Sequence, residues 1–309
     1  MQDIFAPFGD SAPPRHAASS GSVLDGKLFL VGLGAQKAGS TWMARYLGTH
    51  PDVYVPRLKE LHYFDAVYMR RLSEHVPNRM IRLAKEVSDL IDEGGRISRK
   101  KLERLQAVID RLQMTADRKY HYLKFFEDRV TDEKVFCDIT PAYAILDVDG
   151  YEAILRTHPD VRFVFIMRDP VERFWSAVRM GVRKIDGFQP YARFLEMLDS
   201  EENVRRTDYK RTILELEKVV SPDRIKYFFF ENLFTEEAAL QLTDFIGVKS
   251  WPATFDKVVN PGEKMPMDPK HFEAALQKFR HVYEFVFERF GDLTPARWRA
   301  SSASLFSGR

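Results

Sequence analysis

Short, continuous apolar runs recur along the chain and alternate with segments of helical period. A run without alternating polar positions is typical of a strand that is buried on both faces of a sheet. Apolar residues with a helical period follow at residues 170 to about 185 and at 192–198. The alternation predicts an α/β fold with a mostly parallel central sheet that is flanked by helices. The four runs occupy residues 28–34, 135–137, 161–167 and 225–230.

A different pattern occupies residues 78 to about 112, where Gly94-Gly95 separates two amphipathic helical faces. Ser98 is placed to cap the second helix. We therefore expect a helical hairpin inserted into the α/β core. Two interpretations of its many basic residues stay open: a solvated surface with acids interspersed, or a wall of the acceptor cleft that attracts an anionic substrate. The apolar positions of the two faces are Leu83, Val87, Leu90 and Ile91, then Leu102, Leu105, Ile109 and Leu112.

The two ends of the chain are expected to lie outside this domain. Residues 1–26 are dominated by Ala, Ser, Pro and Gly and have no period, so they predict a flexible N-terminal arm. Residues 27–300 are expected to form a single domain, and residues 301–309 a C-terminal tail.

Composition excludes several classes of protein. With 45% hydrophobic and 13% aromatic residues, the chain can bury a core, which excludes a disordered or fibrous protein. Lys and Arg number 47 and Asp and Glu 45, so the formal charge of +2 creates no general attraction to nucleic acid or to a membrane. The one cysteine, Cys137, excludes an internal disulfide and a cysteine-based zinc site, and we expect it to be an inert filler of the core.

The sequence shows no pattern of membrane insertion or of export. No apolar run approaches the roughly 18 residues that a membrane-spanning helix needs. The first 26 residues lack the basic and apolar regions of a signal peptide. We therefore expect a cytoplasmic protein without a transmembrane segment.

The first candidate site is the junction between an apolar run and a helical segment, at residues 34–42. Small residues there let the backbone pass close to a ligand, and the amides that open a helix attract an anion. Lys37 adds a full positive charge, and Ser40 and Thr41 add hydroxyls. The alternative is an ordinary strand-to-helix turn with a surface lysine.

This junction differs from the P-loop of nucleoside triphosphatases, whose pattern is G-x-x-x-x-G-K-[ST]. Gly34 and Gly39 have the right spacing, but Lys37 lies two residues before the second glycine instead of directly after it. A kinase or ATPase needs that lysine at the β- and γ-phosphates, so the displaced lysine disfavours triphosphate chemistry. A ligand with one phosphate and one further anionic group fits better.

A second anion site is predicted where the third apolar run ends, at Arg168. Asp169 is placed to cap the next helix, Pro170 suits its first position, and Glu172 completes the pattern of a capping box. Arg168 therefore projects at the carboxyl end of a strand, where open α/β sheets bind ligands. Ser176 lies about two turns into the helix, so a phosphate that touches both residues would lie beside the helix. The alternative is a local ion pair of Arg168 and a packing role for Ser176.

Together, these stretches resemble the sulfotransferases that use 3′-phosphoadenosine 5′-phosphosulfate (PAPS) as donor and release 3′-phosphoadenosine 5′-phosphate (PAP). Residues 36–42 resemble the 5′-phosphosulfate loop of that family, and residues 168–170 with Ser176 resemble its 3′-phosphate motif. Residues 56–65 and 138–143 are similar to the carbohydrate, heparan-type branch and its bacterial relatives. The resemblance runs from about residue 27 to 300 and implies a P-loop-like α/β fold.

The resemblance also implies roles for residues at the donor site. Lys37 would contact the phosphosulfate and stabilise the leaving phosphate, while Arg168 and Ser176 would bind the 3′-phosphate. Residues 260–264 would close over the nucleotide, with Gly262 and Lys264 as contacts. Amides and hydroxyls of the loop after Lys37 would hold the 5′-phosphate, and its residues are Ala38, Gly39, Ser40, Thr41 and Trp42.

At the acceptor side, Glu60 matches the catalytic glutamate of the carbohydrate branch, with His62 as its neighbour in the cleft. Sulfuryl transfer to a hydroxyl needs a base, which is either a carboxylate with a raised pKa or an imidazole that titrates near neutrality. If residues 60–64 are extended, Glu60, His62 and Phe64 face one side. The alternatives are a surface carboxylate and a satisfied core histidine.

The sequence favours a sulfotransferase that transfers the sulfuryl group from PAPS to a hydroxyl acceptor, a carbohydrate or glycolipid more than a small phenol. Two other classes stay open: a P-loop kinase, which would need ATP and Mg²⁺, and a non-catalytic relative that keeps the nucleotide site. Basic residues are diluted by acids, so we expect no nucleic-acid partner. We expect no metal, because no tight set of His, Asp and Glu ligands is found in the sequence.

Overall fold

The computed structural model of the protein describes residues between 21 and 306, with several gaps. Helices and strands are numbered in chain order, with gaps where elements are not described. The described residues are 21–57, 60–69, 84–85, 87–88, 102, 105–106, 109–110, 122–182, 190–255 and 265–306.

Within these residues the central sheet has five parallel strands in the order β2-β3-β1-β4-β5. The predicted α/β class with a mostly parallel sheet is therefore confirmed. Two of the predicted runs match strands to the residue, one is longer, and the last ends one residue early. β2 has only two residues, too few for a hydrophobic pattern, and was not predicted. The strands are β1 (Leu28–Gly34), β2 (Val53–Tyr54), β3 (Val135–Ile139), β4 (Val161–Met167) and β5 (Ile225–Phe229).

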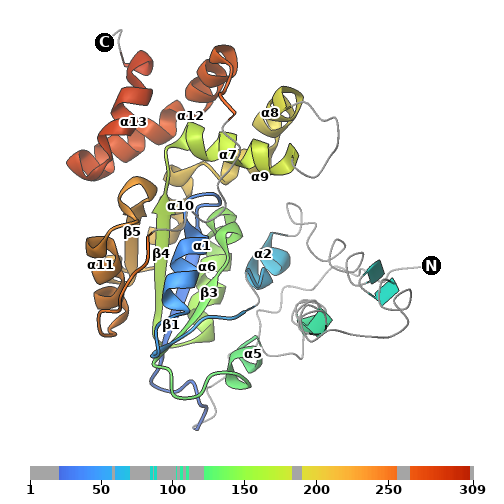
Figure 1. The fold of residues 1–309 in the computed structure, drawn as a ribbon, viewed down its shortest axis with the longest axis vertical. Coiled ribbons are helices and arrows are strands. Elements are labelled where there is room, and N and C mark those ends of the chain that lie inside the picture. The colour runs from blue at the N-terminus through green and yellow to red at the C-terminus, as the bar shows by residue number, and fades with distance from the viewer. Residues whose placement is uncertain are drawn as a thin grey trace.

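Helices flank this sheet, as predicted. Figure 1 shows α1 in front of the sheet, α11 beside β5, and α7, α12 and α13 gathered beyond the end of β4. The helices are α1 (Ser40–Leu47), α2 (Tyr63–Tyr68), α5 (Lys124–Glu127), α6 (Val148–Thr157), α7 (Pro170–Val182), α8 (Pro190–Asp199), α9 (Glu201–Arg205), α10 (Tyr209–Glu217), α11 (Glu236–Ile246), α12 (Pro269–Phe290) and α13 (Ala296–Ser301). Short 3-10 helices are η2 (Pro141–Ile145), η3 (Pro222–Arg224), η4 (Phe230–Asn232), η5 (Gly291–Leu293) and η6 (Ala303–Leu305).

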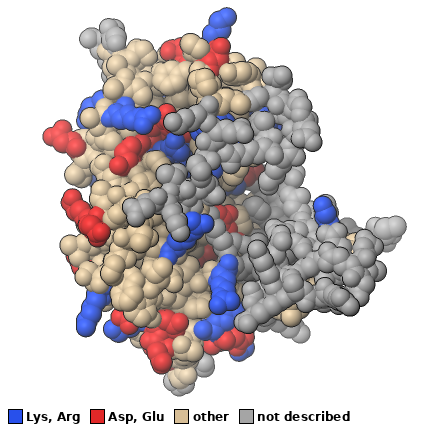
Figure 2. Space-filling view, in the orientation of Figure 1, with Lys and Arg blue, Asp and Glu red and all other residues tan. Residues whose placement is uncertain are grey.

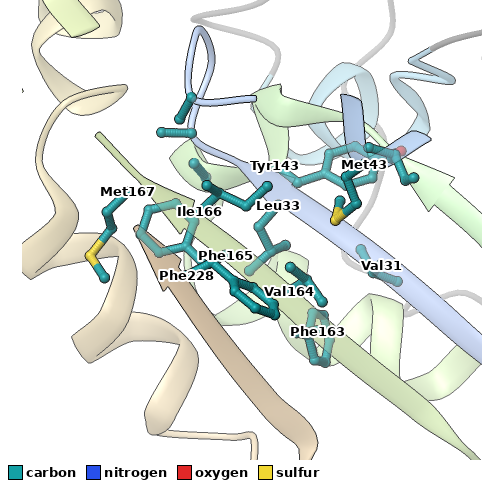
Figure 3. Close-up of a cluster of buried hydrophobic side chains, with 14 of the residues drawn as sticks. Val31, Leu33, Met43, Tyr143, Phe163, Val164, Phe165, Ile166, Met167 and Phe228 are labelled. Carbon is teal, nitrogen blue, oxygen red and sulfur yellow. The ribbon is translucent and has the colours of Figure 1, made fainter. Parts of the chain in front are cut away.

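The core is built around β1, whose seven residues are all buried. Val31 and Leu33 of this strand lie among side chains of β4, Met43 of α1 and Phe228 of β5 (Figure 3). Such a cluster forms because a strand between two parallel neighbours, covered on both faces by helices, has no side exposed to water. The continuous apolar runs of the sequence are the consequence.

Both ends of the domain extend further than predicted. Leu24, within the expected arm, is 2% exposed, and its carbonyl oxygen lies 3.2 Å from Nε2 of His158. At the other end, Leu305 is buried and Phe306 packs against Phe287, within the expected tail. A buried apolar side chain in each segment fastens it to the core, so the packed domain includes residues 21–26 and 301–306. The rest of the predicted arm and tail lies outside the described residues.

The predicted helical hairpin at 78–112 lies mostly outside the described residues. Those described within it, such as Ala84 and Gln106, are helical. Asp110 is buried and pairs with Arg129, 3.0 Å away, beside α5. Among the helices described, none combines the length and the apolar character needed to cross a membrane.

We expect Leu24→Ala to lower the free energy of unfolding by about 2–3 kcal/mol, because it removes a buried side chain and leaves a cavity. Val23→Ala is the matched control, since its neighbour Val23 is 39% exposed and its truncation should change stability by less than about 0.5 kcal/mol. Urea denaturation of both variants is the measurement. Equal, small effects would show that this segment is not part of the packed domain.

Candidate functional site

The carboxyl ends of β1 and β4 bring the two predicted anion-binding segments to one edge of the sheet. The two strands are adjacent and parallel, with Gly34 opposite Phe165. Past the end of β1, the amide of Ala35 donates to the carbonyl of Ile166 (2.6 Å). The loop after β1 therefore starts beside the segment that carries Arg168, at the edge where parallel sheets bind ligands.

The loop after β1 depends on two residues with left-handed backbone conformations. Lys37 has a φ of 70° and Gly39 a φ of 99°. The conformation favours glycine at position 39, and a Cβ there would also lie 2.6 Å from Cδ2 of Leu233, which would have to move. α1 begins at the next residue, Ser40, whose side chain is buried.

The amides of this loop fall into two groups. Those of Ala38 and Trp42 donate to the carbonyls of Ala35 (3.1 Å) and Gly39 (2.9 Å). Those of Gly39 and Ser40 have no acceptor in the described part of the chain, and no side chain described here caps α1. The latter pair is thus oriented for an anion at the helix start, where the helix dipole adds to the attraction.

Arg168 joins the two predicted sites. Its Nη1 donates to the carbonyl of Lys37 (3.3 Å), and its Nη2 pairs with Oε2 of Glu172 (3.0 Å). The guanidinium carbon lies 4.7 Å from the centre of the Phe230 ring, in the geometry of a cation–π contact. Phe230 was expected at the end of a buried strand, but it opens η4, half-buried beneath Arg168. Ser176 lies half-buried on α7, in the second turn of the helix that follows Arg168.

Positive charge is concentrated at the start of α7. Arg173 is fully buried there, and its guanidinium has no hydrogen-bond acceptor among the described residues. Burial, with the nearby guanidinium groups of Arg206 and Arg168, lowers the pKa of Arg173 to about 10, so the group is still cationic at neutral pH. A bound anion near these residues would reduce their mutual repulsion.

Asp169 caps α7 as predicted, since its Oδ1 accepts from the amide of Glu172 (3.0 Å). The predicted return contact of a capping box is wrong. The Glu172 carboxylate pairs with Arg168 and with Arg297 (3.2 Å), while the Asp169 amide donates to Oε1 of Glu231 (3.4 Å). A guanidinium is a stronger partner for a carboxylate than a neutral amide is, which explains the choice of Glu172.

The C-terminal helices hold this cap in place. Asp169 also accepts from the hydroxyls of Tyr283 (2.9 Å) and Ser301 (2.7 Å), and the indole of Trp298 donates to Oε1 of Glu231 (2.9 Å). Burial raises the pKa of Asp169, and these donors oppose the rise. The start of α7, and with it Arg168, is thus fixed by residues more than a hundred positions away in the sequence.

Glu60 and His62 lie in a turn, so residues 60–64 are not extended and the condition for Glu60, His62 and Phe64 to face one side is not met. Glu60 has a φ of 63° and His62 a φ of 54°, and α2 begins at Tyr63. The turn still brings the two predicted side chains together, with Nε2 of His62 3.4 Å from Oε2 of Glu60. Asp65, to which the sequence analysis gave no role, lies 2.8 Å from Nδ1 of His62. The spacing of three residues between His62 and Asp65 at a helix start was the signal for this pair.

The imidazole of His62 lies between two carboxylates of different exposure. Asp65 is fully buried, His62 is 13% exposed and Glu60 is 32% exposed. Burial alone would lower the pKa of His62, but the hydrogen bonds and charges of Asp65 and Glu60 outweigh it and raise the pKa above its ordinary value. The contact with Asp65 fixes the ring orientation and leaves Nε2 toward Glu60.

The remaining residues of the sequence analysis either pack in the core or lie outside the described part of the chain. Gly262 and Lys264 lie outside the described residues. The ring of Trp42 stacks on Tyr46, with ring centres 5.4 Å apart, so it packs in the core. Cys137 is fully buried in β3, where burial raises the pKa of its thiol and makes it a poor nucleophile.

The surface electrostatics are mixed. Figure 2 shows Lys and Arg residues interspersed with Asp and Glu residues on the described part of one face. In the described ranges, no group of three His, Cys, Asp or Glu side chains could hold a metal ion. The candidate site is therefore a local concentration of cations beside a local concentration of carboxylates.

Comparison with known proteins is consistent with this arrangement. A model of the sulfotransferase family matches residues 29–253. No match was found among the curated proteins. Among solved structures, a sulfotransferase from Alicyclobacillus acidocaldarius has a TM-score of 0.58 and 19% sequence identity, over 88% of this chain and 98% of that chain. This similarity supports a common fold.

Two other solved structures are less similar. The sulfotransferase domain of the olefin synthase from Synechococcus PCC 7002 has a TM-score of 0.45 and 16% identity, over 83% of this chain and 94% of that chain. A sulfotransferase from Mycobacterium avium has a TM-score of 0.42 and 12% identity, over 85% of this chain and 78% of that chain.

We expect Asp65→Asn to lower the pKa of His62, because the amide keeps the shape and an acceptor oxygen but loses the charge that favours imidazolium. Histidine-selective NMR titration measures this value. The folded-state pKa of His62 is raised, so its stabilisation is present at low pH and lost as the pH rises through that pKa. The loss of stability in Asp65→Asn should therefore be larger at about pH 5 than at about pH 9.

Asp268→Asn is the matched control, since Asp268 forms a similar pair with His271 at the start of α12 (3.5 Å). It should leave the titration of His62 unchanged. An unchanged pKa of His62 in Asp65→Asn would contradict the role given to Asp65.

Proposed function

The chain belongs to the sulfotransferase family, whose model covers residues 29–253, and we propose that it transfers the sulfuryl group of PAPS to a hydroxyl of a carbohydrate or glycolipid. The observation that carries the residue assignments is the contact between Arg168 Nη1 and the carbonyl of Lys37 (3.3 Å). It joins two anion-binding segments that are 131 residues apart in the sequence. One ligand with two anionic groups would bind both segments at once.

The donor site consists of the loop after β1 and the start of α7. Lys37 and the first amides of α1 suit the 5′-phosphosulfate, and Arg168 with Ser176 suits the 3′-phosphate. The chemistry of the residues fits such a group, because the Gly39 and Ser40 amides have no acceptor among the described residues and the guanidinium of Arg168 lies beside the same loop. Ala38, Thr41 and Trp42 belong to the same proposed loop, and Gly262 and Lys264 are assigned as closing contacts by resemblance alone.

PAPS supplies the sulfuryl group, and PAP is the leaving group. Lys37 stabilises the charge that develops on that phosphate, which a cation at a fixed position does without reorganisation. Glu60 accepts the proton of the acceptor hydroxyl. We assign the base to Glu60 and not to His62, because Glu60 is the more exposed of the two and His62 lies between two carboxylates.

His62 then has a supporting role. Its imidazole is held by Asp65 and lies 3.4 Å from the Glu60 carboxylate, which it orients. Glu60 is the most exposed of the three groups, as a residue that meets an incoming hydroxyl must be.

The acceptor class rests on residues 56–65 and 138–143, which are similar to the carbohydrate branch of the family. Tyr63 and Tyr68 on α2 are half-buried and combine an apolar ring face with a polar hydroxyl, which suits a sugar. An assay with oligosaccharide, glycolipid and small phenol acceptors, compared by kcat/KM, tests this assignment. A phenol as the best acceptor would contradict it.

We expect Arg168→Ala and Lys37→Ala to weaken PAP binding by about 10- to 100-fold, because each removes a charged contact to a phosphate. Arg224→Ala is the matched control, since Arg224 lies before β5 at the opposite end of the sheet, 3.3 Å from the carbonyl of Pro159. Calorimetric titration with PAP in metal-free buffer is the measurement. Binding of ATP with Mg²⁺ in place of PAP would support the kinase alternative.

Glu60→Gln should leave PAP affinity within about twofold and lower kcat by about 100- to 10,000-fold, because it removes the proton acceptor and keeps the shape. Single-turnover sulfuryl transfer measures this. Undiminished turnover would contradict the assignment of the base. A wild-type protein that binds PAP but transfers no sulfuryl group to any acceptor would support the non-catalytic alternative.

A further inference from the structure

A buried carboxylate lies beneath the turn that carries Glu60 and His62. Asp138, near the carboxyl end of β3, is fully buried and accepts three hydroxyl hydrogen bonds. The donors are Tyr122 (2.6 Å) and Tyr143 (2.7 Å) to Oδ2, and Thr140 (2.6 Å) to Oδ1. Figure 3 shows Tyr143, one of these donors, beside β1. The mechanism proposed above makes no use of this group.

The three bonds fix the direction of every hydroxyl in the cluster. A neutral hydroxyl has one hydrogen, and an ionised carboxylate can only accept. When Thr140 and Tyr143 give their hydrogens to Asp138, their oxygens present only lone pairs to other neighbours.

Those lone pairs face the backbone of the turn. The amide of His62 donates to Oγ1 of Thr140 (3.5 Å), and the amide of Tyr63 donates to the hydroxyl oxygen of Tyr143 (3.1 Å). Both amides lie where the chain leaves the left-handed conformation of His62 and enters α2. Such a conformation is costly for a residue with a side chain and needs support from its surroundings.

We propose that Asp138 is a positioning residue for the catalytic turn, which acts through Thr140 and Tyr143 to hold the backbone at His62 and Tyr63. The inference rests on the proposed function, in which Glu60 and His62 handle the proton. Asp138 itself touches neither group, so its effect on transfer is indirect.

Three hydroxyl donors around Asp138 are the arrangement that an ionised carboxylate accepts, although its pKa is raised overall. Burial raises its pKa, while the three hydroxyl donors and the nearby charge of His62 oppose that rise. Tyr122 and Tyr143 stay neutral, because burial and Asp138 raise their pKa values well above the ordinary range. Cys137 on the same strand stays a thiol for the same reasons. Asp65 faces the cluster from α2 and pairs with His62.

The test compares four variants in two assays. Asp138→Asn replaces one acceptor oxygen by an amide donor, which forces a hydroxyl to reverse, and Thr140→Val removes one acceptor of the turn. Thr140→Ser keeps the hydroxyl. Thr243→Val removes a buried hydroxyl of α11 that donates to the carbonyls of Ala239 (3.2 Å) and Leu240 (2.9 Å), away from the turn.

We expect kcat to fall by about 100-fold in Asp138→Asn and by about 10-fold in Thr140→Val, since small misplacement of a reacting group has effects of this size. The Kd for PAP should stay within about twofold in both, because the donor loop is not part of the cluster. Thr140→Ser and Thr243→Val should keep kcat within about twofold. In Asp138→Asn, the pKa of His62 measured by NMR should also fall, because a nearby negative charge is lost.

Several outcomes would overturn the inference. One is a normal kcat in a folded Asp138→Asn protein, and another is a loss of PAP affinity equal to the loss of kcat, which would indicate general structural damage. The NMR titration does not depend on turnover. If Glu60→Gln keeps full activity, the proposed function fails first; if Glu60→Gln is inactive and Asp138→Asn is normal, only the present inference fails.

Discussion

The candidate site depends on the parallel pairing of β1 with β3 on one side and with β4 on the other. Parallel strands end at a common edge, so the segment after each of the three strands arrives at one place. The register is restrained where Gly32 faces Ile139, because a Cβ at Gly32 would lie 3.0 Å from Cγ2 of that residue. Through this pairing, three segments meet at one edge of the sheet. Thr140, which supports the Glu60 turn, follows β3, the loop with Lys37 follows β1, and Arg168 follows β4. A different strand order would separate these segments.

The charges that matter for the candidate site act locally and not through the net charge of the protein. A formal charge of +2 over 309 residues attracts no particular class of molecule, and opposite charges are interspersed on the face in Figure 2. In the proposed function they are sorted: Lys37 and Arg168 serve the donor, and Glu60 and Asp65 serve the acceptor. Sulfuryl transfer needs this division, because the leaving group gains negative charge while the attacking hydroxyl loses a proton. The Glu172 carboxylate, paired with Arg168, limits the excess of positive charge on the donor side.

Much of the fold and part of the site could be predicted because the signals are local. Fully buried strands give continuous apolar runs, and a strand followed by Gly, Lys and hydroxyl residues gives the loop before α1. The turn at Glu60 could not be predicted, because the amides of His62 and Tyr63 that follow it donate to Thr140 and Tyr143, about 80 residues away. The C-terminal segment was predicted to be a tail, because no periodicity in the sequence reveals that the Ser301 hydroxyl donates to Asp169. In both cases the contact that fixes the local structure is polar and is made with a residue distant in sequence. A hydrophobic pattern shows only which residues share a face of one helix or strand.

The left-handed residues suggest how the site keeps its geometry. Gly39 adopts this conformation with no side chain to oppose it, but Lys37, Glu60 and His62 carry the side chains that the proposed function uses. Each such residue costs about 1 kcal/mol or more in backbone strain. At two of them the backbone has a specific polar partner, Arg168 at the Lys37 carbonyl and Thr140 at the His62 amide. These partners are the residues that the proposed function assigns to donor binding and to support of the base, so the backbone at Lys37 and at His62 is held from the segments that follow β4 and β3.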